Sequence, residues 1–376
     1  MKIGLVCYPT FGGSGVVATE LGMALAQKGH EVHFISYRQP VRLDVFLPNL
    51  YFHEVCVTQY PLFEYPPYEL TLTSKMVEVA RYHNLDIFHV HYAIPHASAA
   101  YLAQQILKSE GMDVPFITTL HGTDITLLGE LPNFKPVIAF AMEQSAAITC
   151  VSESLKRDTL ARFALRNKQI VAIPNFVDAY ACQESKVIAR RACLAKPEEK
   201  ILIHTSNFRK VKRVQDIVKV YEKIRADIAC KVVLVGDGPE RSILEDYVRQ
   251  HGYEKDFKFL GNLTCVHEIL QTADAFILPS EQESFGLSAL EAMNAGVPVI
   301  SSNAGGIPEV NIHGKTGFVS PIGDTDDMAK NLRYLWKDEQ TLSKFKAQAK
   351  ERATHFSIAN ILPQYEAVYQ SVLVNV

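Results

Sequence analysis

Two glutamates eight residues apart, Glu283 and Glu291, lie in the stretch of this sequence best suited to hold a charged ligand. The apolar residues 275–278 predict a strand, and residues 287–295 predict a helix that follows a polar loop. This order places Glu283 in a strand-to-helix turn and Glu291 about 7 Å beyond the start of the helix, at roughly 1.5 Å per residue. The two carboxylates therefore flank the helix start.

The amides at this helix start, from Phe285 to Leu287, have no acceptor within the helix and attract an anion. A carboxylate, an amide cluster and a second carboxylate suit the sugar, the diphosphate and the ribose of a nucleotide-diphosphate-sugar. Glutamates on helices are usually solvated, but Glu291 has the apolar neighbours Leu290 and Ala292. A carboxylate in a buried helix needs a hydrogen-bond partner, and ribose hydroxyls would serve.

A cationic loop, Ser206 to Arg213, follows the strand predicted over residues 201–204. Four positive charges within five residues are usually a solvated face. In a loop that follows a strand, they can instead neutralise a leaving diphosphate. Arg209 can grip two oxygens with its planar guanidinium, and Lys212 acts as a point charge.

The tetrapeptide Gly12-Gly13-Ser14-Gly15 follows the first predicted strand and precedes a helix. It is not the G-x-G-x-x-G of dinucleotide-binding domains, and residues 34–38, where the second strand ends, contain no acidic residue. The sequence therefore does not favour a nicotinamide cofactor. The glycines serve a tight turn, a close approach of the backbone to a phosphate or an acceptor carboxylate, or both.

Three further loops follow predicted strands: His121-Gly122-Thr123-Asp124, Gly236-Asp237-Gly238 and Gly305-Gly306. A lone histidine in a loop is more often structural, but the place of His121 after a strand and beside a glycine favours a functional role. Asp124 could cap the next helix, which is a structural role. The need for tight turns explains most of the residue types in the two glycine loops. Their backbone could in addition lie close to a nucleotide.

The segment Asp324-Thr325-Asp326 has the spacing of a metal-binding D-x-D, but it opens a predicted helix, and N-capping explains it. No histidine or cysteine cluster has metal-ligand spacing along the sequence. We therefore expect a protein that requires no metal.

Strand-like and helix-like runs alternate along most of the chain, which predicts βαβ units and parallel sheets. The first series contains strands at 3–7, 31–36, 88–91, 116–120 and 147–151 and helices at 16–28, 97–108 and 137–145. The second series contains strands at 201–204, 231–235, 257–260, 275–278 and 297–301 and helices at 214–225, 241–251 and 287–295. Residues 172–178 predict a crossover, 186–200 an exposed helix and turn, and 326–376 a mostly helical end.

The two series predict an α/β protein with two Rossmann-like domains that face each other across a cleft. We expect an N-terminal domain over residues 1–173 and a C-terminal domain over 174–376, whose last helix packs back on the N-terminal domain. Ligands of open α/β sheets bind at the carboxyl ends of the strands, and all the loops named above follow strands.

The chain has 376 residues, enough for two domains, with 48% hydrophobic and 21% charged residues, as in soluble globular proteins. Its net charge of −3 gives no reason to expect nucleic acid as a partner. The opening apolar run is too short for a signal peptide, and no stretch approaches the roughly 18 apolar residues of a membrane span. Seven scattered cysteines without a C-x-x-C pair indicate free thiols in a cytoplasmic protein. The oligomeric state stays open, a homo-oligomer included.

Together these motifs resemble family 4 of the retaining glycosyltransferases, which have the GT-B fold. The matching motifs are, in chain order, Gly12 to Gly15, the His121 loop, Arg209 with Lys212, the Glu-x7-Glu of Glu283 and Glu291, and Gly305-Gly306. The resemblance covers essentially the whole chain, and five motifs in order are far more specific than Glu-x7-Glu alone. One departure is Ser206-Asn207, where many members have Gly-Arg.

A closer resemblance is to the members of this family that act in the bacillithiol pathway. The segments that carry it are Cys7 to Gly15, His91 to His96, His121 to Asp124 and Ser206 to Arg213. Those enzymes transfer N-acetylglucosamine from UDP-GlcNAc to the hydroxyl of L-malate with retention, as the first step of the pathway. The resemblance therefore implies UDP-GlcNAc and L-malate as the substrates, with no cofactor.

The same resemblance implies the site residues. The expected catalytic residues are His121, which contacts the donor sugar, Arg209 and Lys212, which stabilise the departing UDP, and Glu283, which contacts sugar hydroxyls. The expected donor-binding residues are Gly13, Gly236, Ser284, Phe285, Gly286, Leu287 and Glu291, the last of which holds the ribose. The expected acceptor-binding residues are Ser14, Tyr92, Thr123 and Asn207.

Two mechanisms would give retention. Glu283 could attack as a nucleophile, by analogy with retaining glycosidases. We favour a front-face reaction in which the departing phosphate oxygen takes the acceptor proton. Other activities stay open: a nucleotide-sugar epimerase, a lipid glycosyltransferase, or a sugar-nucleotide binder without catalysis.

Overall fold

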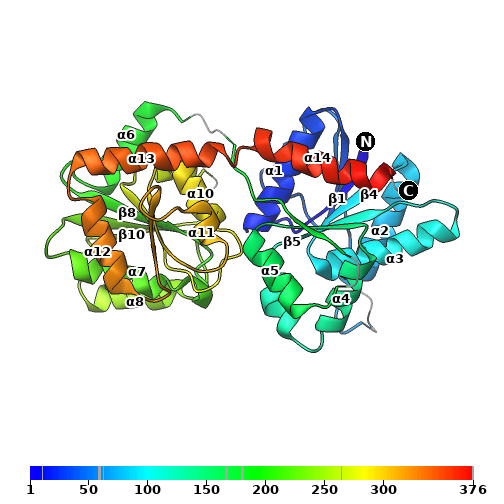
Figure 1. Ribbon diagram of the computed structural model, residues 1–376, viewed down its shortest axis with the longest axis horizontal. Coiled ribbons are helices and arrows are strands. Elements are labelled where there is room, and N and C mark those ends of the chain that lie inside the picture. The colour runs from blue at the N-terminus through cyan, green and yellow to red at the C-terminus, as the bar shows by residue number, and fades with distance from the viewer. Residues whose placement is uncertain are drawn as a thin grey trace. The chain divides into compact units, whose positions relative to one another are not determined.

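The computed structural model describes residues 1–10, 12–57, 61, 63–165, 168–178, 182–263 and 265–374. The chain forms two compact units (Figure 1). Unit 1 contains Met1–Asn175 and Ile358–Val376, and unit 2 contains Phe176–Ser357. The chain thus leaves unit 1 once and returns to it for its last helix.

Unit 1 is built on a seven-stranded sheet in the order β3-β2-β1-β4-β5-β6-β7, with every pairing parallel. Its strands are β1 (Lys2–Val6), β2 (Glu31–Ser36), β3 (Leu50–Glu54), β4 (Ile87–His91), β5 (Phe116–Leu120), β6 (Ala147–Cys150) and β7 (Ile170–Ala172). Its helices are α1 (Gly13–Gln27), α2 (Tyr68–His83), α3 (Ser98–Ser109), α4 (Lys135–Gln144), α5 (Glu153–Arg162) and α14 (Ile358–Val374), with the short turns η1 (Ala93–Ala97), η2 (Thr123–Leu127) and η3 (Leu128–Glu130).

Unit 2 is built on a six-stranded parallel sheet in the order β10-β9-β8-β11-β12-β13. Its strands are β8 (Lys200–Thr205), β9 (Cys230–Val235), β10 (Phe257–Gly261), β11 (Ala275–Leu278), β12 (Val299–Ser302) and β13 (Gly317–Ser320). Its helices are α6 (Glu184–Leu194), α7 (Val214–Ile224), α8 (Arg241–Gln250), α9 (His267–Leu270), α10 (Leu287–Asn294), α11 (Ile307–Val310), α12 (Thr325–Leu335) and α13 (Glu339–Thr354), with the short turn η4 (Lys210–Lys212).

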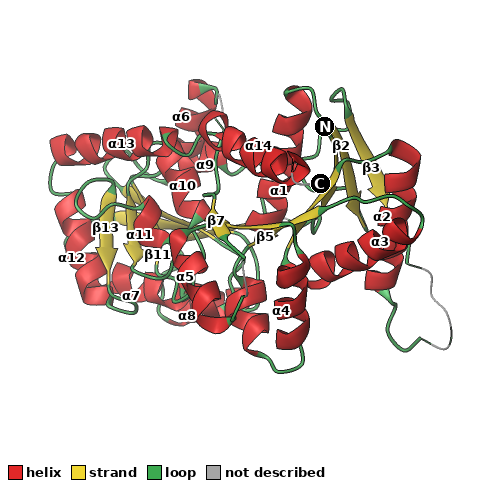
Figure 2. Cartoon of the chain, turned by 45° about the vertical axis from the view of Figure 1, so that its right-hand side comes forward, coloured by secondary structure: helices red, strands yellow, loops and turns green. Residues whose placement is uncertain are grey.

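The central strands are buried along their whole length because helices cover both faces of the sheets. Every residue of β4, β5 and β11 is buried, as expected for parallel strands inside an α/β layer structure. Figure 2 shows the strands enclosed by helices in each unit. The prediction of an α/β protein with two Rossmann-like domains and a helical C-terminal segment is therefore confirmed.

The elements that the sequence patterns missed include β3, α2, α5, β7, α9 and β13. The strand β3 is a partly exposed edge strand, so its apolar signal is weak. The strand β7 has three residues and lies where the sequence predicted the start of a crossover. Apolar burial is the signal that predicts a strand, and edge strands carry the least of it.

The strand order reverses once in each sheet, and these two positions locate the candidate sites. In unit 1 the reversal lies between β1 and β4, and in unit 2 between β8 and β11. Ligands of open parallel sheets bind beyond the carboxyl ends of the strands at such a switch point. The loops that follow these four strands, and their neighbours, are therefore the places to search.

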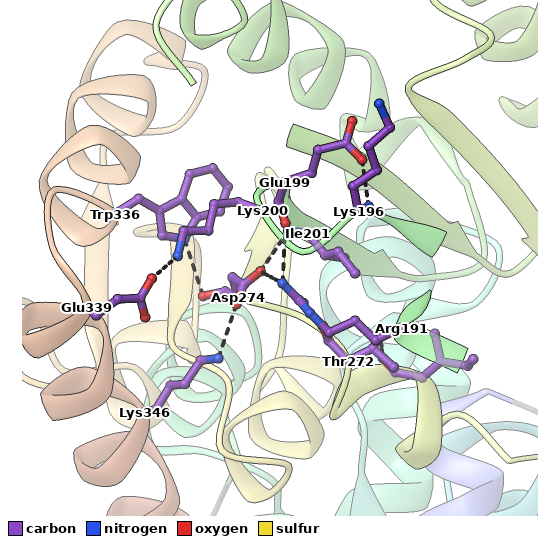
Figure 3. A network of polar contacts seen from close by, with 11 residues as sticks. Arg191, Lys196, Glu199, Lys200, Ile201, Thr272, Asp274, Trp336, Glu339 and Lys346 are labelled. Carbon is purple, nitrogen blue, oxygen red and sulfur yellow. Dashed lines mark hydrogen bonds and ion pairs between the residues drawn. The ribbon is translucent and has the colours of Figure 1, made fainter. Parts of the chain in front are cut away.

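The amino ends of β8 and β11 are held by a buried carboxylate (Figure 3). Asp274 Oδ2 accepts hydrogen bonds from Arg191 Nη2 at 3.0 Å and from the Ile201 amide at 2.9 Å, and Oδ1 accepts one from Lys346 Nζ at 3.2 Å. The Trp336 indole donates to the Asp274 carbonyl oxygen. This network ties α6, β8 and α13 together at the end of the sheet away from the switch-point loops.

Candidate active site

In unit 2, the loop after β8 and the loop after β11 are joined by an ion pair. Lys212 Nζ lies 2.5 Å from Glu283 Oε2, and both side chains are largely buried, at 18% and 16% exposure. The Glu281 amide donates to the Val211 carbonyl oxygen at 2.9 Å, so the backbones of the two loops also pair. The sequence-predicted cation and carboxylate therefore meet directly at the switch point.

The other cations of this loop have different surroundings. Arg213 forms ion pairs with Asp216 at 2.6 Å and with Glu281 at 3.5 Å, which raise the pKa of its guanidinium. Arg209 and Lys210 are exposed, and no ion pair to either lies within the described part of the chain. Arg209 can therefore contact a ligand directly. Lys212 must first leave its ion pair with Glu283.

A buried histidine that the sequence analysis did not single out orients the start of the cationic loop. His204 Nδ1 lies 2.8 Å from the Ile277 carbonyl oxygen, so this nitrogen carries the proton and donates. His204 Nε2 must then accept, and Ser206 Oγ donates to it at 2.7 Å. Burial lowers the pKa of His204 to about 4, so the ring is neutral at pH 7. Ser206 Oγ also accepts the Phe208 amide at 3.2 Å.

Four glycines allow the neighbouring loops to approach at backbone distance. A Cβ on Gly236, where φ is +120°, would lie 1.8 Å from the Ser206 carbonyl oxygen, and one on Gly305, where φ is +50°, would lie 2.0 Å from that of Glu283. The other two, Gly238 and Gly306, meet the carbonyl oxygens of Asn207 and Ser284 in the same way. These positions require glycine because the loops after β9 and β12 lie directly against those after β8 and β11.

The start of α10 has the form of an anion site. Gly286 precedes the helix at φ +97°, and no side chain caps this end within the described residues. Ser284 and Leu287 are partly buried, whereas Phe285 is buried and its ring contacts that of Phe356. Glu291 is partly buried one turn further along the helix. The predicted order of carboxylate, amides and carboxylate is present in the structure.

In unit 1, a hydrogen bond joins the start of α1, the helix after β1, to the loop after β4. Tyr92 Oη donates to Ser14 Oγ at 2.7 Å. Gly13 is the first residue of α1. A Cβ on Gly15 would lie 2.5 Å from the Thr10 carbonyl oxygen, which explains the glycine there. Phe11, part of the same sequence motif, lies outside the described residues.

His121 follows β5 and packs between two aromatic groups from β4 and the loop after it. Its ring lies 5.1 Å from the ring of His91 and 5.0 Å from that of Tyr92. Burial lowers the pKa of His121 to about 3 and that of His91 well below its usual value, so both are neutral at pH 7. A neutral imidazole can donate a hydrogen bond to a ligand but brings no charge to it.

The contact between these histidines indicates which nitrogen of His121 carries the proton. His91 Nδ1 lies 2.8 Å from His121 Nε2, and His91 Nε2 is buried without a hydrogen-bond partner in the described structure. A buried N–H without an acceptor is rare, so the proton of His91 belongs on Nδ1 and points to His121. His121 then accepts at Nε2 and carries its own proton on Nδ1, ready to donate.

Asp124 joins two loops rather than capping a helix, which corrects the structural role predicted for it. Its carboxylate accepts the Ala93 amide and the Gly122 amide, each at 3.0 Å. Burial raises its pKa to about 6, and these hydrogen bonds oppose that rise. Thr123, beside it, is exposed. Asp324, by contrast, caps α12 through the Asp327 amide at 2.9 Å, as the sequence predicted.

The structure thus divides the predicted residues into two groups. Those in unit 1 are Gly13, Ser14, Tyr92, His121 and Thr123, and those in unit 2 are Asn207, Arg209, Lys212, Gly236, Glu283, Ser284, Phe285, Gly286, Leu287 and Glu291. Asn207 therefore belongs to the unit that carries the donor candidates, although it was predicted to bind the acceptor. Sequence reasoning assigned no role to His91 and His204, and their positions near the ends of buried strands were the available signal.

Comparisons with known proteins agree with this division. Residues 11–180 match the family described as Glycosyltransferase Family 4, and residues 187–352 match Glycosyl transferases group 1. The chain is 48% identical to the N-acetyl-alpha-D-glucosaminyl L-malate synthase of Bacillus anthracis, over 99% of this chain and 97% of that relative.

Solved glycosyltransferase structures have the same fold at low sequence identity. Sucrose-phosphate synthase from Thermosynechococcus elongatus superposes with a TM-score of 0.81 at 20% identity, over the whole of both chains. HepE of Anabaena, solved in complex with UDP and glucose, superposes with a TM-score of 0.82 at 19% identity, over 99% of this chain and all of that one. In the described residues, no helix has the length and apolar character of a membrane span.

Proposed function

The chain belongs to family 4 of the glycosyltransferases, and from this premise we propose that it transfers N-acetylglucosamine from UDP-GlcNAc to the hydroxyl of L-malate, with retention at the anomeric carbon. This would be the first step of bacillithiol synthesis. The observation that carries the proposal is the 48% identity to the Bacillus anthracis synthase over nearly the full length of both chains. The name of that relative describes an α-linked product, and UDP-GlcNAc is itself α-linked.

The geometry of unit 2 supports its role as the donor-binding domain. The amides from Phe285 to Leu287 at the start of α10 suit the diphosphate, because a helix start favours negative charge. Glu291, one turn along α10, suits the ribose hydroxyls. The backbone at Gly236 lies against Ser206, at the start of the cationic loop. Arg209 and Lys212 supply the positive charge that the departing UDP requires.

Unit 1 carries the groups that we assign to the sugar and the acceptor. His121 donates from Nδ1 to the donor sugar. Ser14, Tyr92 and Thr123 offer hydroxyls for the carboxylates and the hydroxyl of malate, and Gly13 offers its backbone at the start of α1. Asn207, in unit 2, is the remaining acceptor candidate.

The reaction that we propose takes place on one face of the sugar. The bond between the anomeric carbon and the UDP phosphate oxygen breaks, and the malate hydroxyl oxygen forms a new bond to the same carbon. The proton of that hydroxyl passes to the departing phosphate oxygen. The chain needs no metal for this step, because Arg209 and Lys212 offset the charge that develops on the diphosphate.

Glu283 is better placed to hold Lys212 and the sugar hydroxyls than to attack the sugar. Its carboxylate is engaged by Lys212 at 2.5 Å, and an ion-paired carboxylate is a weaker nucleophile. A covalent sugar trapped on Glu283, detected by mass spectrometry of the intact protein after rapid quenching, would overturn the front-face reaction.

One incubation separates the proposed function from the alternatives. UDP-GlcNAc is supplied alone, with L-malate, with a panel of other hydroxy acids and with lipid acceptors, and both UDP and the sugar product are quantified. Malate-dependent UDP release with an α-linked product supports the proposal. Formation of UDP-ManNAc without malate identifies an epimerase, and UDP binding without turnover in any mixture identifies a binding protein. Release only with lipid acceptors identifies a lipid glycosyltransferase.

We also propose that the protein acts in the cytoplasm, where nucleotide-sugars are available as donors. Fractionation of the source cells with an antibody to the chain tests this, and recovery in the membrane or extracellular fraction would contradict it.

A further inference from the structure

Three histidines far apart in the sequence meet at one edge of the unit 1 sheet. His33 lies on β2, His53 on β3, and His83 is the last residue of α2. One ring nitrogen of each lies within 4.8 Å of those of the other two. The closest pair is His33 Nδ1 and His53 Nε2, at 2.9 Å. Figure 2 shows α2 beside this edge of the sheet.

The register of the two strands explains why these side chains share one face. Tyr51 pairs with His33, and His53 pairs with Ile35. Because side chains alternate along a strand, His33 and Ile35 point to the same side, and so do Tyr51 and His53. The end of α2 brings His83 over that face, with its ring centre 4.2 Å from that of His33 and 5.2 Å from that of His53.

A carboxylate orients the central histidine in the way that metal-binding histidines are oriented. His33 Nε2 lies 3.0 Å from Glu31 Oε1, and this hydrogen bond is the main cause that lowers the pKa of Glu31. A carboxylate that accepts the proton of Nε2 leaves Nδ1 with its lone pair. That lone pair points toward His53, which is the direction a shared ligand would need.

A simpler explanation is a hydrogen-bonded aromatic cluster without a ligand. His53 Nε2 then donates to His33 Nδ1, and the Tyr51 ring stacks on His33. This explanation accounts for the positions of His33 and His53, but it gives no role to the ring nitrogens of His83. Lys2 Nζ lies 3.6 Å from Glu31 Oε1 and donates to the His83 carbonyl oxygen. Its positive charge disfavours a cation at the cluster, but its hydrogen bond fixes the end of α2.

We propose that His33, His53 and His83 form a binding site for a late first-row divalent metal ion such as Zn²⁺. Tetrahedral Zn²⁺ with bonds of about 2.0–2.1 Å to imidazole nitrogens sets those nitrogens roughly 3.3 Å apart, which small side-chain rotations reach from the arrangement described. His53 would move its proton from Nε2 to Nδ1, so the site binds the ion without net loss of a histidine proton. Water completes the fourth position, since His53 and His83 are partly exposed.

The ion would be structural. Lys2 and Glu31 are the first residues of β1 and β2, and they pair in register. Glu31 and the end of α2 that Lys2 holds therefore lie at the amino ends of β1 and β2, and His33 and His53 lie further along β2 and β3. Ser14 and Tyr92, by contrast, follow the carboxyl ends of β1 and β4. An ion held by β2, β3 and α2 joins the helix to an edge strand that is otherwise partly exposed.

The test uses untagged full-length protein, stripped of metal with a chelator and titrated with ZnCl₂ in a calorimeter. His83→Gln is the principal variant because His83 lies at a helix end, and His355→Gln, an exposed histidine of unit 2, is the matched control. We expect His83→Gln to weaken Zn²⁺ binding at least tenfold, and Glu31→Gln to weaken it by roughly 10- to 100-fold through His33. His355→Gln should bind as the natural protein does.

Two further measurements keep the proposal open to refutation if a variant is unstable. Co²⁺ bound to the natural protein should show the visible spectrum of tetrahedral nitrogen ligation, without the strong near-ultraviolet bands of thiolate ligation. The melting temperature of the natural protein should rise with Zn²⁺, and that of His83→Gln should not. Equal Zn²⁺ affinity in the natural protein and in His83→Gln, or thiolate bands with Co²⁺, would overturn the site. Transfer activity of metal-stripped protein should be unchanged, so this proposal and the proposed function fail independently.

Discussion

Lys212 and Glu283 are 71 positions apart in the sequence, yet Lys212 Nζ lies 2.5 Å from Glu283 Oε2. They follow β8 and β11, the neighbouring strands between which the order of the unit 2 sheet reverses. Unit 1 repeats the relationship: Tyr92 and Ser14 follow β4 and β1 and share a hydrogen bond of 2.7 Å. In each unit, side chains that were predicted to bind substrate therefore join the two segments that follow the switch-point strands.

The ion pair has a consequence for donor binding. In the structure described here, Lys212 and Glu283 neutralise one another. Under the proposed function, a diphosphate at the start of α10 would compete with Glu283 for Lys212, and the charge on the leaving group would grow as the sugar bond breaks. We therefore expect the contribution of Lys212 to be larger in the transition state than in the bound donor.

Replacement of Lys212 by alanine tests this expectation. Turnover should fall by about 10²–10³-fold, the usual loss when one electrostatic contact to the transition state is removed, while the affinity for UDP changes much less. Steady-state kinetics and calorimetry with UDP measure the two effects. Lys210→Ala, an exposed cation in the same loop, should change neither. Equal losses in turnover and in UDP affinity would show that Lys212 only binds.

Glu291→Gln should weaken UDP binding roughly 10-fold or more, because hydrogen bonds to a charged group contribute about 1.5–3 kcal/mol. The affinity for malate should be unaffected, since the ribose belongs to the donor. Calorimetry with UDP and with malate separates the two. Glu254→Gln, an exposed glutamate of the same unit, is the control. An unchanged UDP affinity would remove Glu291 from the ribose.

The glycine contacts predict a difference between two alanine substitutions. At Gly236 a Cβ would meet the Ser206 carbonyl oxygen at 1.8 Å, whereas at Gly252, also at positive φ, it would meet nothing within 4 Å. Both variants bear the left-handed strain of about 1–2 kcal/mol, but only Gly236→Ala should also displace the cationic loop and lower the UDP affinity. Urea unfolding and UDP titration of both variants measure this. Equal UDP affinities would mean that the loop accommodates the methyl group.

Buried histidines in unit 1 should make the protein less stable in acid. Burial lowers the pKa of His89 to about 3, of His96 to about 4 and of His121 to about 3. Unfolded histidines take up protons near pH 6.5, so the unfolded state binds more protons between about pH 6.5 and 4, and stability falls as the pH drops through that range. Each such histidine contributes a slope of up to about 1.4 kcal/mol per pH unit.

Urea unfolding at pH 7.5, 6 and 5 measures this slope. The contribution of these histidines to the free energy of unfolding should vary little above pH 7. Below pH 6 the free energy of unfolding should fall. His96→Gln should reduce the slope, and the exposed His355→Gln should not. A slope that His96→Gln leaves unchanged would show that His96 is protonated in the folded protein.

The network around Asp274 should contribute to stability without affecting the chemistry. Asp274→Ala removes the acceptor for Arg191, Lys346 and the Ile201 amide, and should cost about 1.5–3 kcal/mol of unfolding free energy. Asp326→Ala, which removes an exposed ion pair with Lys223, should cost less than about 1 kcal/mol. The KM for UDP-GlcNAc should stay the same in both variants. A large rise in KM for Asp274→Ala would show that the network also shapes the donor site.

Much of the fold was accessible from local patterns. The buried strands β5 and β11 occupy the residues predicted for them, and the other predicted strands and helices differ mainly at their ends. These elements carry continuous apolar runs or helical spacing, which are local properties. The edge strand β3 and the short strand β7 were missed because their stabilisation comes from neighbours in the sheet rather than from their own composition.

Residue types and their spacing are enough to identify the candidates for the chemistry: the two glutamates around the start of α10, the cationic loop and the histidine after β5 are recognisable by type and by their place after strands. Which of these groups meet, however, depends on the packing of the folded chain. Whether Lys212 contacts Glu283, His91 contacts His121, or His33, His53 and His83 converge depends on strand order and register. Those are set by packing among segments dozens of residues apart, and no local spacing records them.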